Sequence, residues 1–546
     1  MARDPHYLPA LTDMALLMLI DGEYQKAFDY CLHALQIDTY GPAANYYYGL
    51  AGRHLGKTTD AKDGFDIALQ SVEYRGAAAT GLAMLYFGEK DYNRASTYAN
   101  MALGQNDNNM VAYRIVALAH RKLQQMEKAR ETLGKMESLD PLNHFIRFEK
   151  YLMDKSPANR DKFTSMIRNE MPWESYLQLG IEYYQLGLWD DCLEVLGLSP
   201  SYPMVDYWIA FVKNKKGDGD FGTWIEKANN LSPRLAFPFR AATKEVLTWA
   251  TAQTGHWKPQ YYLGLVCAHA HQDEEAKRHF MAGGDRPGFA PFYAARAHLV
   301  PENRLADLKK AASLDKKEWR YGKLLVHYYL DNGNTKEAVK VARQYAGSFP
   351  KNYIMAMLLA KALLLDGQFG AAGKILASTK ILPYEGATES RSLYREAWLM
   401  QAVAAIKNKK YKDALSKIAT ARRWPENLGV GKPYDADIDD RLESYLESLC
   451  FEGMKKHDEA VAIRDKIVSE GIKNDYGNLL VAEIQKGSGK PNQGRDLLAA
   501  WLEENPSSNL AKWCLAAFDG NVDGGYATED PNVRILKAVM LPDNRN

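Results

Sequence analysis

The sequence predicts an all-α protein, a right-handed superhelical solenoid of about thirteen helix pairs with loop insertions. Small residues recur at a fixed spacing, because Ala27, Ala61, Ala95 and Ala129 each follow the previous one by 34 residues. Apolar residues around these alanines recur at helical spacing, and almost no stretch reads as a strand. The chain has 546 residues, too many for one compact core, whereas the core of a repeat array grows with chain length.

A period of 34 residues is typical of tetratricopeptide repeats, in which two helices form a hairpin and small residues lie where the helices cross. The unit is clearest in YYYGLAGRHLGKTTDAKDGFDIALQ, where Tyr48 and Gly49 begin the close contact and Phe65 and Ala68 complete it. We therefore predict four regular repeats over residues 1–141.

The later repeats are less regular. Residues 142–316 are expected to form irregular tetratricopeptide-like repeats, and residues 317–546 continue them with anchors such as Ala338 and Ala372. The final segment PNVRILKAVMLPDN, which follows a break at Gly524-Gly525, is expected to cap the C-terminal end. Four insertions are predicted near residues 142–172, 234–258, 378–393 and 422–440.

The first predicted helix, LTDMALLMLI, is apolar nearly all round from Ala15 to Ile20. Terminal units of a repeat array need a polar outer face to stay in water, and no polar helix precedes this one. We therefore expect another domain or another chain to cover it.

Composition excludes several functional classes. The formal net charge of +1 leaves no basic surface for nucleic acid. No run of eighteen apolar residues and no signal peptide occur, so we expect no membrane contact and a cytoplasmic location, although a chain whose signal has been removed would read the same way. No paired CxxC spacing is present, so the cysteines are expected to be reduced core residues. They are Cys31, Cys192, Cys267, Cys450 and Cys514.

Four irregular stretches carry more than the generic repeat pattern. They are DPLNHFIRFEKYL (140–152), LSPRLAFPFRAAT (231–243), HWKPQYYLGL (256–265) and RRWPENLGVGKPYDADIDDRLESYL (422–446). With them, essentially the whole chain resembles the C-terminal tetratricopeptide half of a family of large bacterial proteins, whose N-terminal half is a domain of unknown function with a galactose-mutarotase-like β-sandwich. The resemblance implies a link to carbohydrate metabolism. This chain departs from the family because it lacks the sandwich.

The insertion at 422–440 contains two prolines and two glycines between Trp424 and Asp435, so we expect an ordered loop outside the helices. Its aromatic rings offer flat faces and its polar side chains offer directional hydrogen bonds to hydroxyl groups. A loop that only re-registers two helix pairs is the alternative. The candidate ligand-binding residues are Trp424, Glu426, Asn427, Lys432, Tyr434 and Asp435.

Glycosidic cleavage requires two carboxylates roughly 5–10 Å apart, and Glu426 and Asp435 are weak candidates for them. We lean against an enzyme for this chain alone; an active chain would be glycoside hydrolase-like. DADIDD lacks the glycine and terminal glutamate of the helix–loop–helix calcium motif. His269, His271 and His279 are spaced so that they face different directions on a helix. We therefore predict no metal and no cofactor.

The loop at 231–243 carries three further candidates, Phe237, Phe239 and Arg240. The residue before a proline avoids the helical region, so Phe237 and its neighbours are expected in an extended piece. Arg240 is then able to hold a carboxylate or a carbonyl of a partner. Alternatively, the two phenylalanines fill a seam between irregular helix pairs.

Two functions stay open. The first is a non-catalytic binding and assembly scaffold whose groove or N-terminal face holds a protein partner, namely a carbohydrate-active β-sandwich domain or a second copy of the chain. The second is a carbohydrate-binding protein or glycoside hydrolase component whose site includes the 231–243 and 422–440 loops and takes an oligosaccharide. A peptide-binding adaptor ranks last, because the sequence has no ordered cluster of lysine and arginine to hold a terminal carboxylate.

Overall fold

The computed structural model describes residues 4–522 and 530–541, and every regular element within these ranges is helical. The predicted all-α helical-repeat fold is confirmed. The chain divides into two compact units, residues 1–302 (unit 1) and 303–546 (unit 2), and each is described by itself. The predicted break at Gly524-Gly525 lies outside the described residues.

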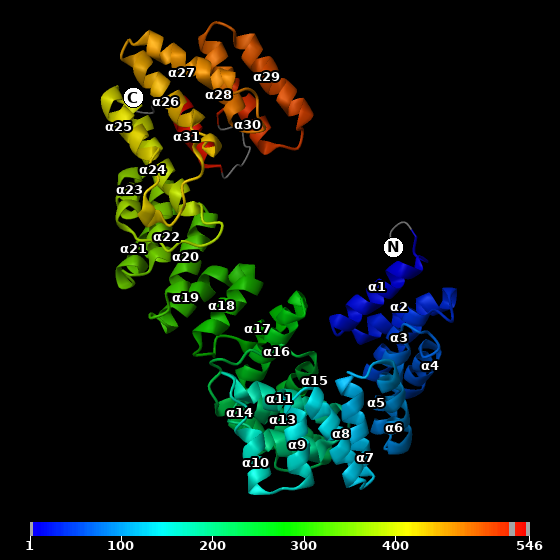
Figure 1. Ribbon diagram of the computed structural model, residues 1–546. Helices are drawn as coiled ribbons and strands as arrows, with labels where there is room; N and C mark the ends of the chain where they lie inside the picture. Colours follow the sequence, from blue (N-terminus) through cyan, green and yellow to red (C-terminus); the bar gives the residue numbers. More distant parts are fainter. Residues whose placement is uncertain (1–3, 523–529, 542–546) are drawn as a thin grey trace. The chain divides into compact units, whose positions relative to one another are not determined.

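Unit 1 is built from antiparallel helix hairpins that follow one another along the chain (Figure 1). Its helices are α1 (Leu8–Ile20), α2 (Tyr24–Ile37), α3 (Pro42–His54), α4 (Thr58–Ala68), α5 (Arg75–Gly88), α6 (Tyr92–Gln105), α7 (Met110–Lys122), α8 (Met126–Leu139), α9 (His144–Met153), α10 (Pro157–Thr164), α11 (Pro172–Gln185), α12 (Trp189–Gly197), α13 (Pro203–Lys216), α14 (Phe221–Asn230), α15 (Ala241–Gln253), α16 (Trp257–His269), α17 (Asp273–Gly283) and α18 (Ala290–Leu299). The short 3₁₀ helix η1 (Pro301–Asn303) lies at the boundary between the units.

Unit 2 continues with the same hairpins and includes one longer helix, α24, of 19 residues. Its helices are α19 (Arg304–Leu314), α20 (Trp319–Asp331), α21 (Thr335–Ser348), α22 (Tyr353–Leu365), α23 (Phe369–Ser378), α24 (Glu389–Lys407), α25 (Tyr411–Ala421), α26 (Arg441–Gly453), α27 (His457–Ser469), α28 (Gly477–Gly487), α29 (Pro491–Glu504), α30 (Asn509–Phe518) and α31 (Pro531–Met540). Two 3₁₀ helices, η2 (Glu426–Leu428) and η3 (Asp435–Asp437), lie in the loop between α25 and α26.

The hairpins close where small residues let two helices cross. The four periodic alanines, from Ala27 to Ala129, are all buried. In the α3/α4 hairpin a Cβ atom on Gly49 would lie 2.6 Å from the Phe65 ring, and a Cβ atom on Gly64 would lie 2.6 Å from the Asn45 carbonyl oxygen. The close contact predicted at Tyr48-Gly49 and Phe65 is therefore present, and only glycine fits at these two positions.

Two segments that the sequence suggested as insertions are helical. Residues 142–172 contain α9 and α10, which pair with each other, and residues 234–258 contain α15. Local capping explains the first case, because the Ser156 hydroxyl accepts a hydrogen bond from the Asn159 amide and Pro157 occupies the first turn of α10. The irregular sequence in this part reflects shorter helices rather than loops. Residues 379–388 and 422–440 do lie outside the α-helices.

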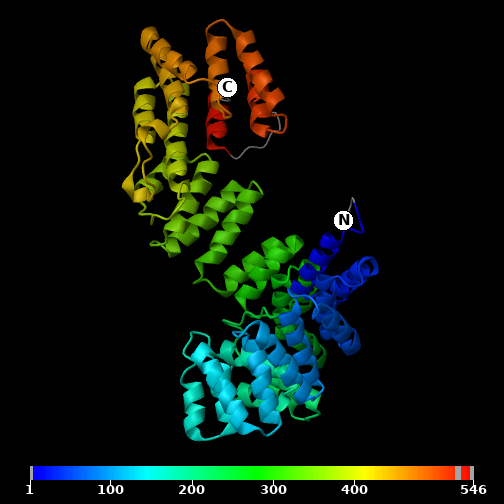
Figure 2. The same cartoon turned by 45° about the vertical axis from the view of Figure 1, so that its right-hand side comes forward.

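Within unit 1 the chain returns to its own start, and both views show α1 close to the α15–α17 region (Figures 1 and 2). The Gln272 side-chain amide, at the turn before α17, donates to the Asp21 carbonyl at 3.2 Å and to the Glu23 carboxylate at 3.0 Å. The Lys244 ammonium of α15 donates to the Gln272 carbonyl oxygen at 2.6 Å. These contacts join the first hairpin to the last ones of the unit.

In unit 2 the C-terminal helix α31 packs against α24, far earlier in the chain. The Arg534 guanidinium bonds both oxygens of the buried Glu396 carboxylate, each at 2.7 Å, and the Arg395 guanidinium donates to the Asn532 side chain at 2.6 Å. The segment expected to form a C-terminal cap therefore also ties the end of unit 2 to its middle.

The five cysteines are free and buried, as predicted. Burial raises the pKa of Cys31 and of Cys450 to about 12, so both thiols stay protonated and unreactive near neutral pH. Among the described residues, none of the helices combines the length and the apolar character that crossing a bilayer requires.

Candidate ligand-binding cavities

Each unit contains a cavity large enough for a small molecule or a few side chains. The unit 2 cavity has a volume of about 560 Å³ and lies between the first turns of α24, the 422–440 loop and the start of α26. The unit 1 cavity has a volume of about 1000 Å³ and lies between the end of α1 and helices α13, α15 and α16. Both volumes are within the usual range for ligand sites.

The 422–440 loop of the unit 2 cavity is held in one conformation by the segment after α23. The Asn427 side-chain amide donates to the carbonyls of Leu376 at 2.9 Å and Thr379 at 2.8 Å, and the Ile381 amide donates to the Asn427 carbonyl at 2.8 Å. Gly429 has a φ of +66°, and a Cβ atom there would lie 2.7 Å from the Ile381 carbonyl oxygen. The predicted ordered loop is therefore present, and its order depends on Asn427 and Gly429.

The most unusual group at this cavity is the guanidinium of Arg391, a side chain that is only 6% exposed. Its Cζ atom lies 4.5 Å from the centre of the Trp424 ring, and Nη2 donates to the Ala421 carbonyl at 2.7 Å. Nε and Nη1 have no acceptor among the described residues. Burial, with the nearby positive charge of Arg395, lowers the pKa of Arg391 to about 10, so it remains charged near neutral pH.

Three other cations at the cavity have anionic partners, and a fourth, Lys466, also lines it. The Arg395 guanidinium bonds both oxygens of Glu443 at 2.6 Å, and the Lys432 ammonium lies 2.6 Å from the Asp435 carboxylate. Arg422 donates to the Glu447 carboxylate at 2.9 Å. Arg391 differs from these three because none of the described carboxylates accepts a hydrogen bond from it.

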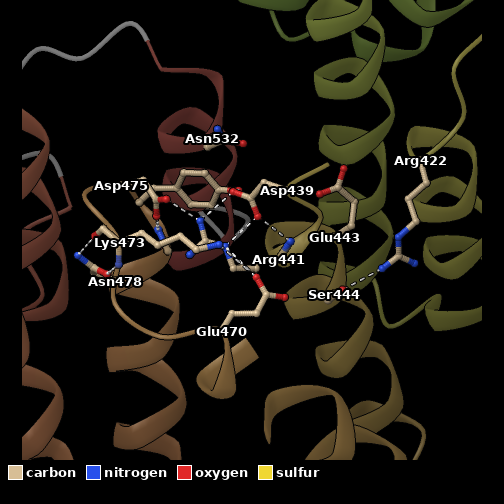
Figure 3. A network of polar contacts seen from close by, with 12 residues as sticks. Arg422, Asp439, Arg441, Glu443, Ser444, Glu470, Lys473, Asp475, Asn478 and Asn532 are labelled. Atoms are coloured by element: carbon tan, nitrogen blue, oxygen red, sulfur yellow. Dashed lines mark hydrogen bonds and ion pairs between the residues drawn. The ribbon is translucent and has the colours of Figure 1, made fainter. Parts of the chain in front are cut away.

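A second polar cluster fixes the end of the loop (Figure 3). The carboxylates of Asp439 and Asp475 both bond the buried Arg441 guanidinium, at 2.8 and 2.7 Å, and the Tyr476 hydroxyl donates to Asp439 at 2.9 Å. Burial on its own would raise the pKa of Asp439, but the hydrogen bonds from Arg441 and Tyr476 lower it to about 2. A Cβ atom on Gly477 would lie 2.1 Å from Arg441 Nη1, so this glycine leaves the space for the guanidinium.

The loop residues predicted as ligand contacts separate into two groups. Trp424, Lys432 and Asp435 line the unit 2 cavity. The other three do not line it: Glu426 is exposed, Tyr434 is 85% exposed, and the Asn427 amide is occupied by backbone carbonyls. The two weak catalytic candidates, Glu426 and Asp435, therefore do not meet at this cavity.

Of the three candidate residues in the 231–243 loop, one lines the unit 1 cavity and two do not. Phe239 lines the unit 1 cavity, and its ring lies edge-on to the His269 ring at 5.8 Å. Phe237 is 57% exposed and lies outside the lining. Arg240 turns to α11, where it pairs with the Glu174 carboxylate and donates to the Gln178 side chain at 3.1 Å. Its guanidinium is thus engaged within unit 1.

The unit 1 cavity is mainly apolar, with aromatic walls from Phe211, Phe239 and Trp249. Ile20, the last residue of α1, is 69% exposed and belongs to the same lining. Leu17, one turn earlier on α1, is 51% exposed. The outer face of α1 and this cavity together therefore form an apolar surface that ends at Ile20.

One cluster has the composition of a metal site. Single ligand atoms of Cys267, Glu275 and His279 lie within 4.8 Å of one another. Lys244 donates to the Glu275 carboxylate at 2.7 Å, so this carboxylate already has a cation as its partner. His269 and His271 line the unit 1 cavity instead. We assign no metal here.

Sequence reasoning missed several of the cavity residues because they lie in ordinary helical stretches. Arg391 and Arg395 are four residues apart, so they lie on the same face of α24, and this spacing was the available signal. Trp249 and Phe211 give no signal beyond the general apolar pattern of a core, because the cavity is lined by helices as distant in the chain as α1 and α16.

Comparison with known proteins supports the repeat in part of the chain. The tetratricopeptide repeat family model matches residues 323–381, which run from α20 past the end of α23. No curated protein matches the sequence.

Among solved structures, a tetratricopeptide repeat protein from Parabacteroides merdae is 17% identical, covers 45% of this chain and 98% of its own, and has a TM-score of 0.29. Naa15/Naa10 bound to HypK-THB is 14% identical over 100% of this chain and 90% of its own, with a TM-score of 0.26. Yeast Tom70 is 13% identical over 97% of this chain and 98% of its own, with a TM-score of 0.23. At these values we base no argument on the similarities.

Proposed function

We propose that this chain is a helical-repeat scaffold that binds another protein domain through the outer face of α1 and the adjoining unit 1 cavity. The observation that carries the proposal is the exposure of Leu16, Leu17 and Ile20 on one side of the first helix, while Leu11 and Ala15 on its other side are buried. The repeat match at residues 323–381 supports the general class, because such arrays serve as extended binding surfaces.

The energetics favour a covered α1. Burying one leucine or isoleucine side chain contributes about 1.5–3 kcal/mol, and three such residues lie exposed on this single face. A helix face that meets water normally carries polar residues. Between Leu11 and Ile20, the exposed residues other than Asp13 are all leucine or isoleucine. A docked domain supplies the cover that the sequence of α1 does not.

The partner that we propose is a β-sandwich domain of the galactose-mutarotase-like kind, as the resemblance of the whole chain implies. The unit 1 cavity, with its aromatic walls, accepts apolar side chains from a loop of such a domain. A second copy of this chain is the competing occupant. The five buried free thiols support a reducing compartment and hence the cytoplasm as the place of assembly.

The experiment mixes the purified chain with a recombinant galactose-mutarotase-like domain and measures binding by calorimetry and mass by sedimentation equilibrium. We expect a complex with the wild type and loss of binding by at least about tenfold, or about 1.4 kcal/mol, in Leu17→Glu and Ile20→Glu. Val72→Glu is the matched control, because Val72 is 79% exposed and outside the unit 1 cavity lining. Equal binding by all variants would refute the role of α1, and a concentration-dependent dimer that Leu17→Glu abolishes would identify a second copy as the occupant.

A second function is supported by the lining of the unit 2 cavity. Trp424, Lys432 and Asp435 line it together, which suits an oligosaccharide bound by stacking and by hydrogen bonds to hydroxyls. Thermal-shift and calorimetric titration with an oligosaccharide panel tests this, with Trp424→Ala expected to lose the binding. A hydrolase component at this cavity would lose activity in Asp435→Asn without losing thermal stability, whereas Glu426 lies outside the lining. No activity on a glycan panel would exclude a hydrolase for this chain alone.

A further inference from the structure

We propose that the unit 2 cavity is a binding site for a small hydroxylated carboxylate, a sugar acid, whose carboxylate is held by Arg391. The site goes beyond the scaffold function and does not depend on it, because it lies entirely in unit 2. Two observations combine here: a cavity of about 560 Å³, and at its wall an arginine that is 6% exposed and has two nitrogens without a partner among the described residues.

The Arg391 guanidinium is buried without a negatively charged partner among the described residues. A buried donor without an acceptor is costly to a folded protein, and buried charges are normally paired. Arg391 has one hydrogen bond, from Nη2 to the Ala421 carbonyl, and contact with the Trp424 ring. Neither supplies a negative charge. An anion within the cavity would supply both the charge and the missing acceptors.

The arginine and lysine side chains of the unit 2 cavity differ in whether they already bond a carboxylate. Glu443 acts on Arg391 electrostatically, but both of its oxygens accept hydrogen bonds from Arg395. Lys432 is paired with Asp435 in the same lining. Arg391 is therefore the guanidinium of the lining without a carboxylate partner among the described residues, while the Lys466 ammonium adds a positive charge to the same lining. Guanidinium nitrogens bind carboxylates with directional, charge-assisted hydrogen bonds.

The other side chains of the cavity lining restrict which anions can bind there. The carboxylates of the lining, among them Asp435, Asp437 and Asp440, offset its arginine and lysine charges, so a ligand with one negative charge suits the cavity better than phosphate, which carries about two. Carboxylates accept hydrogen bonds from hydroxyl groups, and the indole of Trp424 offers an apolar surface to the C–H face of a sugar ring. A monoanion that carries several hydroxyl groups meets all three requirements, and a sugar acid is such a molecule.

A ligand in the cavity must also reach the guanidinium nitrogens of Arg391. Nε and Nη1 of Arg391 are themselves covered in this structure, so the ligand must move part of the cavity wall to reach them. Lys432 and Asp435 form an exposed part of this wall, because their side chains are 54% and 87% exposed. We therefore expect Lys432→Ala to keep the binding, whereas a change at Arg391 removes it.

The experiment uses the full chain and two probes that differ only in oxidation at one carbon, D-glucuronate and D-glucose, in calorimetric titrations at high ligand concentration. We expect glucuronate to bind with a Kd on the order of millimolar and glucose at least about tenfold more weakly. Arg391→Gln should abolish this preference. Arg423→Gln is the matched control, because Arg423 is exposed at the start of the same loop and does not line the cavity.

Each outcome is decisive. Equal binding of the two probes, or an unchanged preference in Arg391→Gln, would overturn the proposal. Acetate or inorganic phosphate binding as tightly as glucuronate would show a general anion site and would also overturn it. The comparison of the two probes uses the unchanged protein, so it stays valid if Arg391→Gln folds poorly. Arg391→Lys, which keeps the charge but not the fork of donors, should retain only part of the preference.

Discussion

The two units use the same helical hairpin but surround cavities of opposite character. In unit 1 the cavity is walled by Phe211, Phe239 and Trp249 and borders the bare face of α1. In unit 2 the cavity is lined largely by arginine, lysine and carboxylate side chains. Each cavity includes residues from a place where the repeat is interrupted, by the loop before α15 or by the loop before α26. The comparison indicates that the regular hairpins provide the frame, while the interruptions determine the chemistry.

Each unit also contains an ionic cluster built around a largely buried arginine. In unit 1 the Arg121 guanidinium lies 2.7 Å from both the Glu149 and the Asp191 carboxylates. In unit 2 Arg441 lies between Asp439 and Asp475. Both clusters join helices or loops that are distant along the chain. They allow the stability of each unit to be changed separately.

The largest expected effect comes from removing these arginines. Removing Arg121 leaves the buried Glu149 carboxylate unpaired and costs about 3–5 kcal/mol, whereas removing Arg441 costs less, because the side chains of Asp439 and Asp475 are 37% and 33% exposed. Arg441→Ala should therefore unfold unit 2 at a lower urea concentration and leave unit 1 unchanged, while Arg121→Ala should do the reverse. Urea denaturation followed by hydrogen exchange resolved along the chain measures this. A simultaneous shift of both units in either variant would show that the two units are not independent in stability.

A smaller effect is expected in the 422–440 loop from Gly429→Ala. Alanine is strained at a φ of +66°, and its Cβ atom would meet the Ile381 carbonyl oxygen at 2.7 Å. We expect a loss of about 1–3 kcal/mol in the stability of unit 2, measured by thermal denaturation. Gly431→Ala is the control in the same loop, because a Cβ atom there has nothing within 4 Å. Equal effects of the two variants would contradict the packing described for Gly429.

The smallest effect on the stability of unit 2 is expected when acid protonates Asp439. Its pKa in the folded protein is lowered from 3.8 to about 2, so its ion pair stabilises unit 2 above about pH 4 and loses this contribution as the pH falls through about 2. Asp439→Asn should make the stability of unit 2 less dependent on pH in this window. Asp437→Asn, a change in the same loop outside the ionic cluster, should leave the acid transition as it is. Urea titrations at pH 2 to 5 measure this difference. If the two variants showed the same pH dependence, Asp439 would not be the group responsible.

Much of the fold could be predicted because the repeat is a local pattern. Ala27, Ala61, Gly49 and Phe65 have roles that depend on neighbours within one hairpin, and their spacing in the sequence reports those roles directly. The short helices α9 and α10 were read as an insertion because their sequence lacks the full period, although Ser156 and Pro157 carry a helix-start signal.

The candidate site could be predicted only in part, because cavities depend on contacts between distant segments. The unusual composition of the 422–440 loop identified Trp424, Lys432 and Asp435, which line the unit 2 cavity. Nothing near Arg391 in the sequence indicates that its guanidinium will be buried beneath Trp424. Likewise, Ile20 and Trp249 line one cavity only because the first hairpin lies against the segment before α17, which is distant in the chain.

The most direct test of the central claim, that α1 is a protein-binding surface, is hydrogen exchange over residues 8–20 with and without a bound galactose-mutarotase-like domain. The account predicts fast exchange on the free chain, because the exposed face of α1 leaves the helix weakly anchored, and strong protection in the complex that Leu17→Glu abolishes. Binding of the domain with no change in exchange over α1, or slow exchange in a strictly monomeric free chain, would contradict it.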